Sequence, residues 1–478
     1  MKSSISFILD GRMVTIDFSR DRTVSPTTTV LNYLRSLPSH KGVKEGCAEG
    51  DCGACTVVLA EPGPDDTLRY KSVDSCLAFL PMLDRKQAIT VENLNDESGE
   101  LHPVQDAMVQ TGGSQCGYCT PGFIMSMFSL YKNHDHPSRA EIDDALTGNL
   151  CRCTGYRPIV EAAAQACVHG SSDRFSRNEP GIARLLNSIP HESLHLETAE
   201  QRYFRPASLG EAITLKHRYP RAVVVCGATD VALRVTKGHE LLSEVIDLSA
   251  IDELREMVDT DSTVSIGAGV SLSDVMAKTR QSLPALFAML SVFGSQQIRN
   301  LATVGGNLGT SSPIGDTLPV LMAYRAIVIL ESLNGGREIP LDKYFTGYRA
   351  TVRRPDELIT AVRIPKPAGG TIVKSYKVSK RKDLDIATVS SGFLLEIDGE
   401  QVVSSIILAY GGMAERTKRA SSAEQFITGK RWGRPVVEEA MKLIDDDFTP
   451  ISDARAGTEM RRIAARNLLL KFWTETIL

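Results

Sequence analysis

The chain has 478 residues, of which 42% are hydrophobic and 23% charged, and its formal net charge is −4. This length predicts about three domains, and the composition is typical of globular proteins with sizeable cores. A charge this small gives no indication of binding to nucleic acid or to a membrane surface. The most apolar stretch, residues 318–330, is short and contains Arg325, so we predict no membrane span. The N-terminus has no recognisable signal peptide, and we therefore expect a cytoplasmic protein in which disulfides are uncommon.

The first segment, residues 1–85, is predicted to be a small mixed α+β domain. Alternating apolar residues here and just beyond predict strands over residues 5–9, 13–18, 55–59 and 89–91. A tight turn at Asp10-Gly11 would join the first two strands. Apolar residues in TTTVLNYLRSL are spaced as in a short amphipathic helix.

Residues 86–167 are predicted to form a helical domain. Four helix-length segments are separated by Gly, Pro or Cys: HPVQDAMVQTG, PGFIMSMFSLYKN, SRAEIDDALTG and RPIVEAAAQAC. Pro121 and Pro158 are placed at first helical turns, where proline is favoured, and Gly148 is placed where a helix would stop.

The rest of the chain is predicted to be a linker followed by two further domains. Residues 168–200 are polar and aperiodic, which indicates a linker. Residues 201–365 show a pattern of strands and glycine loops. Residues 370–478 are expected to contain strands at 376–378, 393–397 and 402–410 and then helices near 437–446 and 453–471.

Ten cysteines occur in the chain, and eight of them lie within the first 153 residues. The first four follow a C-x4-C-x2-C pattern, with twenty residues before the fourth: Cys47, Cys52, Cys55 and Cys76. This is the spacing of plant-type [2Fe–2S] proteins, in which three thiolates on one loop and a fourth from another element converge on a cluster. Glycines within the loop allow backbone N–H groups to turn toward the sulfurs. A zinc site is the alternative, although zinc sites favour paired short knuckles.

The second four cysteines form two short pairs at the ends of predicted helices: Cys116, Cys119, Cys151 and Cys153. Helix N-termini favour thiolates, so four cysteines held between helix ends suit a metal site. Their spacing alone is compatible with zinc or iron, but beside a ferredoxin-type loop a second [2Fe–2S] cluster is the preferred interpretation. The remaining two, Cys167 and Cys226, are interpreted as small buried hydrophobic residues.

Two glycine-bearing stretches, residues 223–233 and 293–323, follow the predicted linker. Small residues let backbone N–H groups approach a diphosphate closely, and hydroxyl groups supply further donors. No G-x-G-x-x-G motif follows a strand, so a Rossmann site is not predicted. The residues alone leave open whether these stretches bind a nucleotide or are glycine turns in a β-rich core.

Taken together, three of the cysteine-bearing motifs resemble the iron–sulfur half of the molybdenum hydroxylases, the xanthine dehydrogenase and aldehyde oxidase family. They are GCAEGDCGACTV, QCGYCTPGFIMSM and LTGNLCRCTGYRPIVEA, with all eight cysteines in register. The resemblance implies one [2Fe–2S] cluster in a β-grasp, ferredoxin-like domain and another in a four-helix domain nearer the molybdenum centre. Gln115 matches a position close to the molybdopterin of the partner module.

The glycine-bearing stretches resemble the FAD-binding motifs of the same family, whose flavin domain is of the vanillyl-alcohol-oxidase (PCMH) type. Carried over by position, the first group would surround the diphosphate and its neighbourhood: Val224, Val225, Cys226, Gly227, Ala228, Thr229, Asp230 and Val231. The second group would line another side of the site: Thr303, Gly306, Asn307 and Thr310.

Four further positions match FAD neighbours in the family. Asp316 would hold the ribose or adenine side, and Phe293 would stack on the isoalloxazine. Ile359 and Lys377 would lie near the flavin on its NAD-facing side. Residues 370–478 resemble the family's α+β flavoprotein C-terminal domain, and the loop at 380–385 is closer to bacterial than to mammalian members.

The resemblance further implies an electron-transfer protein. Two clusters and FAD on one chain of this length resemble the small subunit of the bacterial xanthine dehydrogenases, so we expect a separate large molybdopterin-binding subunit in an α2β2 heterotetramer. Electrons from the oxidation of hypoxanthine or xanthine to urate would pass through the clusters to FAD and then to NAD+. We expect no catalytic acid, base or nucleophile for purine chemistry on this chain.

Three alternatives remain open at this point. The chain could serve another molybdenum hydroxylase that acts on an aldehyde or N-heterocycle, because substrate-binding residues would lie on the partner. It could be a free-standing, NADH-linked iron–sulfur flavin reductase. A third alternative is a zinc-stabilised binding module with glycine turns, which would be colourless.

Overall fold

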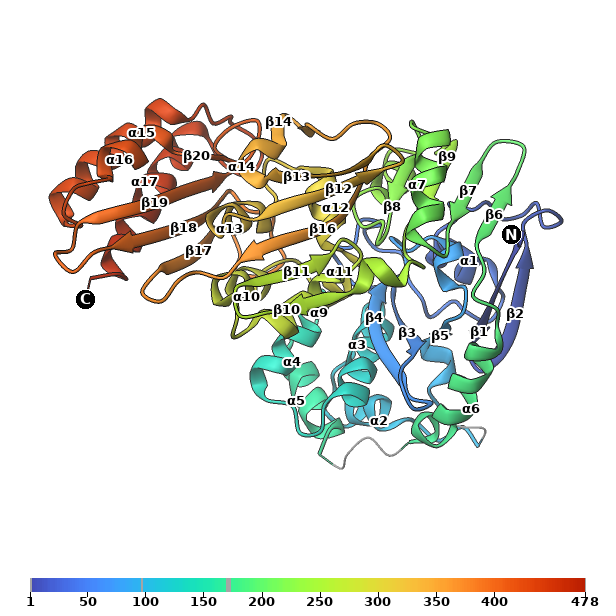
Figure 1. The fold of residues 1–478 in the computed structure, drawn as a ribbon. Coiled ribbons are helices and arrows are strands. Elements are labelled where there is room, and N and C mark those ends of the chain that lie inside the picture. The colour runs from blue at the N-terminus through green and yellow to red at the C-terminus, as the bar shows by residue number, and fades with distance from the viewer. Residues whose placement is uncertain (1, 96–97, 169–172, 478) are drawn as a thin grey trace. The chain divides into compact units, whose positions relative to one another are not determined.

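A computed structural model describes residues 2–95, 98–168 and 173–477. They form two compact units. Within the described ranges, the first unit comprises residues up to 215, 221–251 and 295–302, and the second comprises 216–220, 252–294 and the residues from 303 onward. Figure 1 labels their elements. The described part of the chain holds no helix long and apolar enough to cross a bilayer.

The first unit begins with a five-stranded sheet in the order β2-β1-β5-β3-β4, in which β1 and β5 are parallel. Its elements are β1 (Ser4–Leu9), β2 (Arg12–Asp17), α1 (Val30–Ser36), β3 (Thr56–Pro62), β4 (Leu68–Asp74) and β5 (Gln87–Ile89), with short 3-10 turns at Leu80–Leu83 and Val91–Asn93. The predicted hairpin is confirmed: Asp10 and Gly11 both have positive φ, as a tight turn between twisted strands requires. Strand β4 was not predicted.

Four helices follow, and all four were predicted. They are α2 (Pro103–Gln110), α3 (Thr120–Asn133), α4 (Arg139–Leu146) and α5 (Arg157–Ala166). Pro121 and Pro158 lie in the first turns of α3 and α5, as expected. Helix α4 starts with a capping box in which the Ser138 and Glu141 side chains each accept from the other's backbone N–H.

The expectation of an irregular linker over residues 168–200 is wrong for most of that segment. Residues 169–172 lie outside the described residues, but α6 (Arg174–Ser188) and β6 (Leu194–Glu197) follow them. Asp173 caps α6 by accepting from the N–H of Ser176 at 2.7 Å. Phe175, Ala183 and Leu186 are buried on one face of this predominantly polar helix, and Pro180 lies in its interior, where a proline normally indicates that a helix ends.

The first unit also contains a four-stranded sheet in the order β6-β7-β9-β8. The remaining elements are β7 (Arg202–Arg205), β8 (Val223–Val225), α8 (Ala232–Thr236), β9 (Glu244–Asp247) and α11 (Gln296–Leu301), and α7 (Leu209–Arg218) runs across the boundary between the units. Helix α11 packs against β4. The second glycine-bearing stretch therefore contributes one helix to the first unit.

The second unit contains a five-stranded antiparallel sheet in the order β10-β11-β16-β12-β13. Its strands are β10 (Met257–Asp259), β11 (Thr263–Gly267), β12 (Ile327–Ser332), β13 (Gly335–Pro340) and β16 (Leu358–Pro365). Short helices lie between them: α9 (Leu272–Thr279), α10 (Pro284–Leu290), α12 (Val304–Thr310), α13 (Thr317–Ala323) and α14 (Leu341–Tyr344). A 3-10 turn at Asp252–Arg255 and the small hairpin β14 (Phe345–Gly347) and β15 (Ala350–Thr351) complete this part. The sequence predicted strands and glycine loops here and missed these helices, because each is only one or two turns long.

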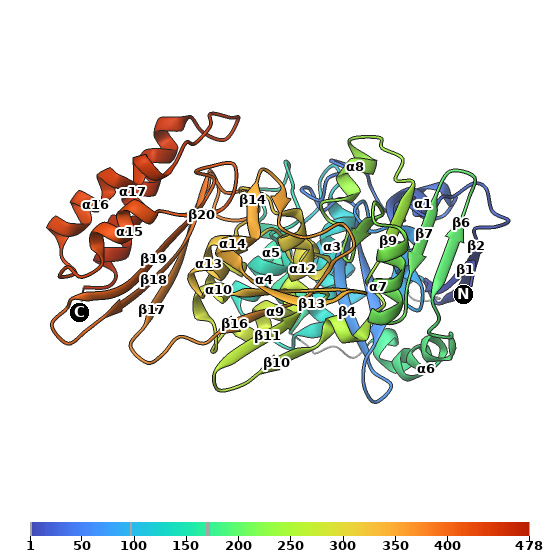
Figure 2. The same ribbon diagram turned by 45° about the horizontal axis from the view of Figure 1, so that its top comes forward.

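The C-terminal part of the second unit is a sheet covered on one face by helices, as Figure 2 shows. The sheet order is β17 (Ile372–Val378), β18 (Val389–Ile397), β19 (Val403–Gly411) and β20 (Lys418–Arg419). The covering helices are α15 (Ser421–Ile427), α16 (Arg434–Asp447) and α17 (Thr458–Thr474). The predicted strands and both predicted helices are confirmed, whereas α15 was not predicted. Helix α13 packs against β18 and β19.

Candidate iron–sulfur and flavin sites

The first four cysteines are presented by a loop and by the ends of two paired strands. Cys47 and Cys52 lie in the loop after α1, Cys55 immediately precedes β3, and Cys76 follows β4. The thiols approach in pairs: Cys52 donates to Cys47, and Cys55 donates to Cys76. The antiparallel pairing of β3 with β4 brings the distant Cys76 to the loop.

The loop around Cys47 is shaped for an anionic sulfur centre. The backbone N–H groups of Glu49 and Asp51 point at the Cys47 Sγ atom, at 3.4 and 3.3 Å. A Cβ at Gly46 would lie 2.7 Å from the Cys52 Sγ atom, so only glycine leaves room for that sulfur. The directed N–H groups and the space beside Gly46 are both compatible with an iron–sulfur cluster, because the sulfurs of such clusters accept hydrogen bonds from backbone N–H groups.

Hydrogen bonding to Cys52, followed by the N–H groups of Glu49 and Asp51, lowers the pKa of Cys47 to about 5. The same thiol contact raises the pKa of Cys52. Contact with Cys76, then burial, raises the pKa of Cys55. Because one thiol of each pair loses its proton only with difficulty beside its partner, a four-thiolate state needs the positive charge of a metal centre.

The second four cysteines are gathered between the N-terminus of α3 and the loop after α4. Cys119 precedes α3, and its thiol bonds to that of Cys151. The exposed Cys116 and Cys153 thiols also bond to each other. The N–H of Cys153 and the hydroxyl of Thr154 lie 3.4 and 3.2 Å from the Cys151 Sγ atom. These donors also fit an iron–sulfur cluster.

Burial raises the pKa of Cys119 to about 12, and its contact with Cys151 adds to this. Burial also acts to raise the pKa of Cys151, but hydrogen bonds from Thr154 and the N–H of Cys153 outweigh it and lower the pKa. In the described part of the chain, no three His, Cys, Asp or Glu side chains are already arranged as a metal-binding group. The structure thus brings each predicted set together as hydrogen-bonded pairs of thiols.

Sequence reasoning missed two polar side chains that contact these sites. Asp74 is fully buried and accepts from the Cys55 thiol at 3.6 Å. Asn149, two residues before Cys151, is also buried and donates to the carbonyl oxygen of Gly53. Their positions beside the cysteines in the sequence were the only available signal.

The predicted FAD residues divide between the two units. Val224 to Val231 belong to the first unit, where β8 leads through a turn into α8. A Cβ at Gly227 would lie 1.7 Å from the Leu301 carbonyl oxygen, and Ala228 has a φ of +58°. Any side chain at position 227 would clash with the backbone of Leu301, so this turn requires glycine there.

In the second unit, α12 and its N-cap residue carry four of the predicted FAD residues. Thr303 caps the helix by accepting from the N–H of Gly306 at 3.0 Å. Val304 and Leu308 are buried, whereas Gly306 and Gly309 are exposed. Helix α12 therefore presents a face of small residues, which permits a ligand to approach the backbone closely. Asn307 accepts from Thr317 at the start of α13, and Ile359 on β16 packs under α12.

Asp316 and Lys377, which the resemblance assigns to different parts of FAD, form one ion pair. Lys377 Nζ lies 2.8 Å from Asp316 Oδ2, and their side chains are only 4% and 7% exposed. Burial raises the pKa of Asp316, and the Lys377 ammonium opposes that effect. The Asp316 Oδ1 atom is buried with no partner among the described residues. An orphaned buried oxygen of this kind fits a site that receives a donor from a bound cofactor.

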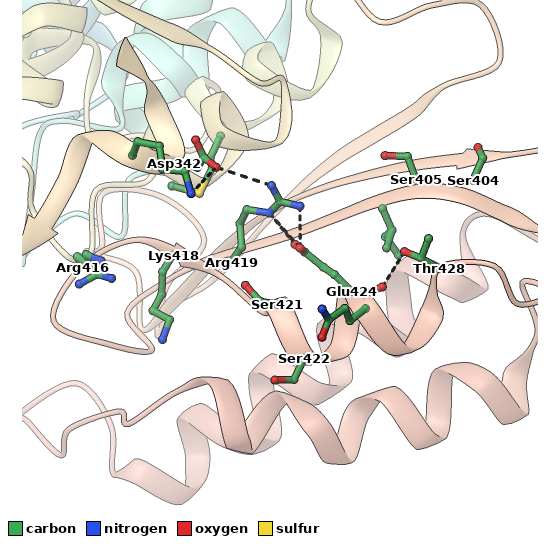
Figure 3. A pocket seen from close by; sticks show the side chains of 14 residues that line it. Asp342, Ser404, Ser405, Arg416, Lys418, Arg419, Ser421, Ser422, Glu424 and Thr428 are labelled. Carbon is green, nitrogen blue, oxygen red and sulfur yellow. Dashed lines mark hydrogen bonds and ion pairs between the residues drawn. The ribbon is translucent and has the colours of Figure 1, made fainter.

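A pocket of about 630 Å³ lies elsewhere in the second unit, beside β19, β20 and α15. None of the predicted cofactor residues, all of which the structure describes, lines this pocket. Figure 3 shows that Glu424 and Asp342 both face Arg419. The N–O distances from Arg419 to Glu424 are 2.7 to 3.0 Å. We assign no ligand to this pocket.

Three family models match this chain. A [2Fe-2S] binding domain matches residues 90–164, and an FAD binding domain in molybdopterin dehydrogenase matches residues 197–367. A CO dehydrogenase flavoprotein C-terminal domain matches residues 374–476. The fold and these matches define an iron–sulfur flavoprotein related to the molybdopterin dehydrogenases.

The chain is homologous to xanthine dehydrogenases over almost its whole length. It is 33% identical to the xanthine dehydrogenase of Emericella nidulans over 93% of this chain and 36% of that protein. It is 31% identical to the xanthine dehydrogenase/oxidase of Gallus gallus over 98% of this chain and 39% of that protein. The chain thus spans little more than a third of the length of these relatives.

Solved structures show the same fold. A carbon monoxide dehydrogenase chain from Hydrogenophaga pseudoflava superimposes with a TM-score of 0.55 and 26% identity, over 58% of this chain and 96% of that one. A quinoline 2-oxidoreductase chain from Pseudomonas putida superimposes with a TM-score of 0.53 and 24% identity, over 58% of this chain and 96% of that one.

Proposed function

We propose that this chain is the electron-transfer subunit of a xanthine dehydrogenase, equivalent to the small subunit of the bacterial enzymes. Two groups of four cysteines and a molybdopterin-dehydrogenase-type FAD domain in one chain are the observation that carries the proposal. Homology to xanthine dehydrogenases over 93% and 98% of the chain supports it. The reaction served would be the oxidation of hypoxanthine and xanthine to urate.

When bound, the two [2Fe–2S] clusters would supply one-electron transfer, and FAD would supply the conversion of single electrons into a pair for NAD+. The chain's own residues hold and tune these groups. The cysteines Cys47, Cys52, Cys55 and Cys76 would hold one cluster, and Cys116, Cys119, Cys151 and Cys153 the other. The N–H groups directed at Cys47 and Cys151 would stabilise charge on the cluster ligands.

We further propose that α12 and the Asp316–Lys377 pair contact FAD. The small exposed residues of α12 would let its backbone approach the cofactor, and Asp316 Oδ1 would accept from it. Lys377 would keep that carboxylate charged and correctly oriented through its bonds to Asp316 and to the Val292 carbonyl oxygen, both 2.8 Å. The stretch from Val224 to Val231 would bind the diphosphate region.

A large molybdopterin-binding subunit is the proposed source of electrons, in an α2β2 heterotetramer located in the cytoplasm. The surroundings of the second cysteine group support a docking face at that point. Cys116 and Cys153 are exposed there, as are the nearby side chains of Tyr118, Leu150 and Tyr156, at 50%, 37% and 40%. Exposed aromatic and aliphatic side chains around a redox centre suit burial against a partner.

Metal and flavin analysis of the purified complex, followed by a xanthine-driven NAD+ reduction assay, tests the proposal. About four irons and one FAD per chain are expected, together with molybdenum in a co-purifying large subunit. About two irons per chain would contradict the assignment of two clusters. Activity with O2 but not NAD+ would contradict the proposed acceptor.

A second candidate is the same role in another molybdenum hydroxylase. The structural similarity to chains of carbon monoxide dehydrogenase and quinoline 2-oxidoreductase favours it. Assaying the complex with xanthine, an aldehyde and an N-heterocycle separates the two candidates. A complex with about four irons per chain that oxidises the aldehyde or the other N-heterocycle, but not xanthine, would support the second candidate.

A further inference from the structure

Asn149 lies at the centre of a buried hydrogen-bond network in the first unit. Its side chain is almost fully buried, at 2% exposure. The Nδ2 group donates to the Gly53 carbonyl oxygen at 3.0 Å and to the Thr56 hydroxyl at 3.2 Å. The Oδ1 atom accepts from the Ser126 hydroxyl at 2.6 Å and from Gln297 Nε2 at 3.0 Å. All four hydrogen-bonding positions of the amide are thus occupied, which is the most that an asparagine side chain can make.

The segments that meet at Asn149 pack so closely that three of them need glycine. A Cβ at Gly53 would lie 2.3 Å from the Gly148 carbonyl oxygen and 2.4 Å from Asn149 Nδ2. A Cβ at Gly122 would lie 2.2 Å from the Gly53 carbonyl oxygen. A Cβ at Gly148 would lie 2.0 Å from Gln297 Oε1. Alanine at any of these three positions would therefore force neighbouring backbone or the Gln297 side chain to move.

Each of these segments carries a predicted cofactor ligand or lies in the flavin domain. Gly53 lies between Cys52 and Cys55, and Asn149 precedes Cys151 by two residues. Helix α3, which contributes Ser126, begins directly after Cys119. Helix α11, which contributes Gln297, lies within the span matched by the FAD binding domain. One side chain therefore contacts the loops of both cysteine groups and a helix of the flavin domain.

We propose that Asn149 is a positioning residue that sets the placement of the two cluster loops relative to each other and to α11. The inference rests on the proposed function, because it concerns the geometry between two bound clusters. A neutral amide suits this role, since it supplies two donors and two acceptors without adding charge beside the clusters. An alanine at this position would leave the Gly53 carbonyl, Thr56, Ser126 and Gln297 without their common partner, and the loops would be free to shift.

The test compares the wild-type complex with Asn149→Ala by iron analysis and by electron paramagnetic resonance of the reduced protein. We expect iron to remain at about four per chain. We also expect loss of the resolved splitting that arises from magnetic interaction between the two reduced clusters, and a shift in their midpoint potentials. Unchanged splitting and potentials in a fully loaded Asn149→Ala protein would overturn the inference.

Two further variants keep the test decisive where Asn149→Ala does not fold. Ser126→Ala and Gln297→Ala each remove one hydrogen bond to Asn149 and should change the splitting in the same direction to a smaller extent. Ser129→Ala is the matched control, because Ser129 is an equally buried serine on the same helix, and its hydroxyl accepts from the Ser72 N–H instead. Wild-type splitting in the control and altered splitting in Ser126→Ala supports the inference, and equal splitting in both overturns it. Failure of the two-cluster assignment, on which the inference rests, is distinguishable, because the wild-type protein itself would then hold fewer than about four irons per chain.

Discussion

Lys377 and Asp316 form a buried ion pair, with Lys377 Nζ 2.8 Å from Asp316 Oδ2. Lys377 also donates to the Val292 carbonyl oxygen at 2.8 Å, whereas the second carboxylate oxygen of Asp316 has no partner among the described residues. Asp316 immediately precedes α13 and Lys377 lies on β17, so the two residues of the pair are 61 positions apart in the sequence. The Lys377 ammonium acts to lower the pKa of Asp316, against burial, which raises it.

The first prediction is that Asp316→Asn lowers both flavin content and stability. The variant leaves the Lys377 ammonium buried without a counter-charge, which costs about 3–5 kcal/mol. Flavin absorbance per chain and denaturant unfolding measure the two effects. The double variant Asp316→Asn, Lys377→Gln removes the unpaired charge and should recover much of the stability but not the flavin. A double variant that binds FAD at the wild-type ratio would show that the pair lies outside the flavin site.

The second prediction concerns the two cysteine groups separately. Cys76→Ser and Cys153→Ser should each reduce iron from about four to about two per chain, because each removes one ligand of a different cluster. Cys167→Ser is the matched control and should retain about four irons, since Cys167 is buried in the core beside α5 and belongs to neither group. Iron analysis and the visible spectrum give the result. Retention of all iron in Cys76→Ser would remove Cys76 from the ligand set.

The third prediction separates backbone strain from loop packing at two glycines. Gly53 and Gly112 have similar positive φ values, +64° and +66°, but a Cβ at Gly112 would meet nothing within 4 Å. Gly112→Ala should therefore lower the free energy of unfolding by about 1 kcal/mol through strain alone. Gly53→Ala adds a clash with Gly148 and Asn149, so the loss should reach about 3 kcal/mol, with reduced iron content. Equal stability and iron content in the two variants would contradict the close packing of the cluster loops.

The fourth prediction is a pH dependence that arises from Asp173. Burial acts to raise the pKa of Asp173, but bonds from His102, the Ser176 N–H and Lys132 outweigh it and hold the pKa well below the usual value. A carboxylate with a lowered pKa stabilises the folded state above its unfolded pKa of about 3.9, and this contribution is lost as the pH falls below that value.

Asp173→Asn tests this dependence. At pH 7 the variant should be less stable by about 3–5 kcal/mol, because Lys132 is left buried without its partner, and the deficit should shrink as the pH is lowered below about 4. The measurement is the difference in the free energy of unfolding between the variant and the wild type at each pH. This difference excludes the contributions of other titrating groups, which both proteins share. Asp143→Asn, at an exposed pair with Arg139, is the control and should change stability by less than about 0.5 kcal/mol. A deficit that is constant with pH would exclude the lowered pKa.

The elements that were predicted correctly are those whose signals are local. The Asp10-Gly11 hairpin depends on two adjacent residues, and helices α2 to α5 are bounded by nearby Gly, Pro or Cys. Spacing predicted the short cysteine pairs and triplet, because residues on one loop are close in space, whereas β3–β4 pairing brings Cys76 to the first loop and the packing of α3 and α4 joins the second set. Helix α6 was missed because its polar sequence gains its fold from a capping aspartate and from packing of a few apolar residues.

The positions of the first strands and helices, and the proposal that two groups of cysteines bind metal, could therefore be stated from the order of the residues alone. The partners of Asn149 could not, because Gly53, Ser126 and Gln297 are far apart along the chain and meet only when separate elements pack. The Asp316–Lys377 pair is of the same kind, and the resemblance had placed its members at different parts of the cofactor. Hydrogen bonds and ion pairs act over a few ångströms, so a contact between distant segments exists only after the core has brought them together.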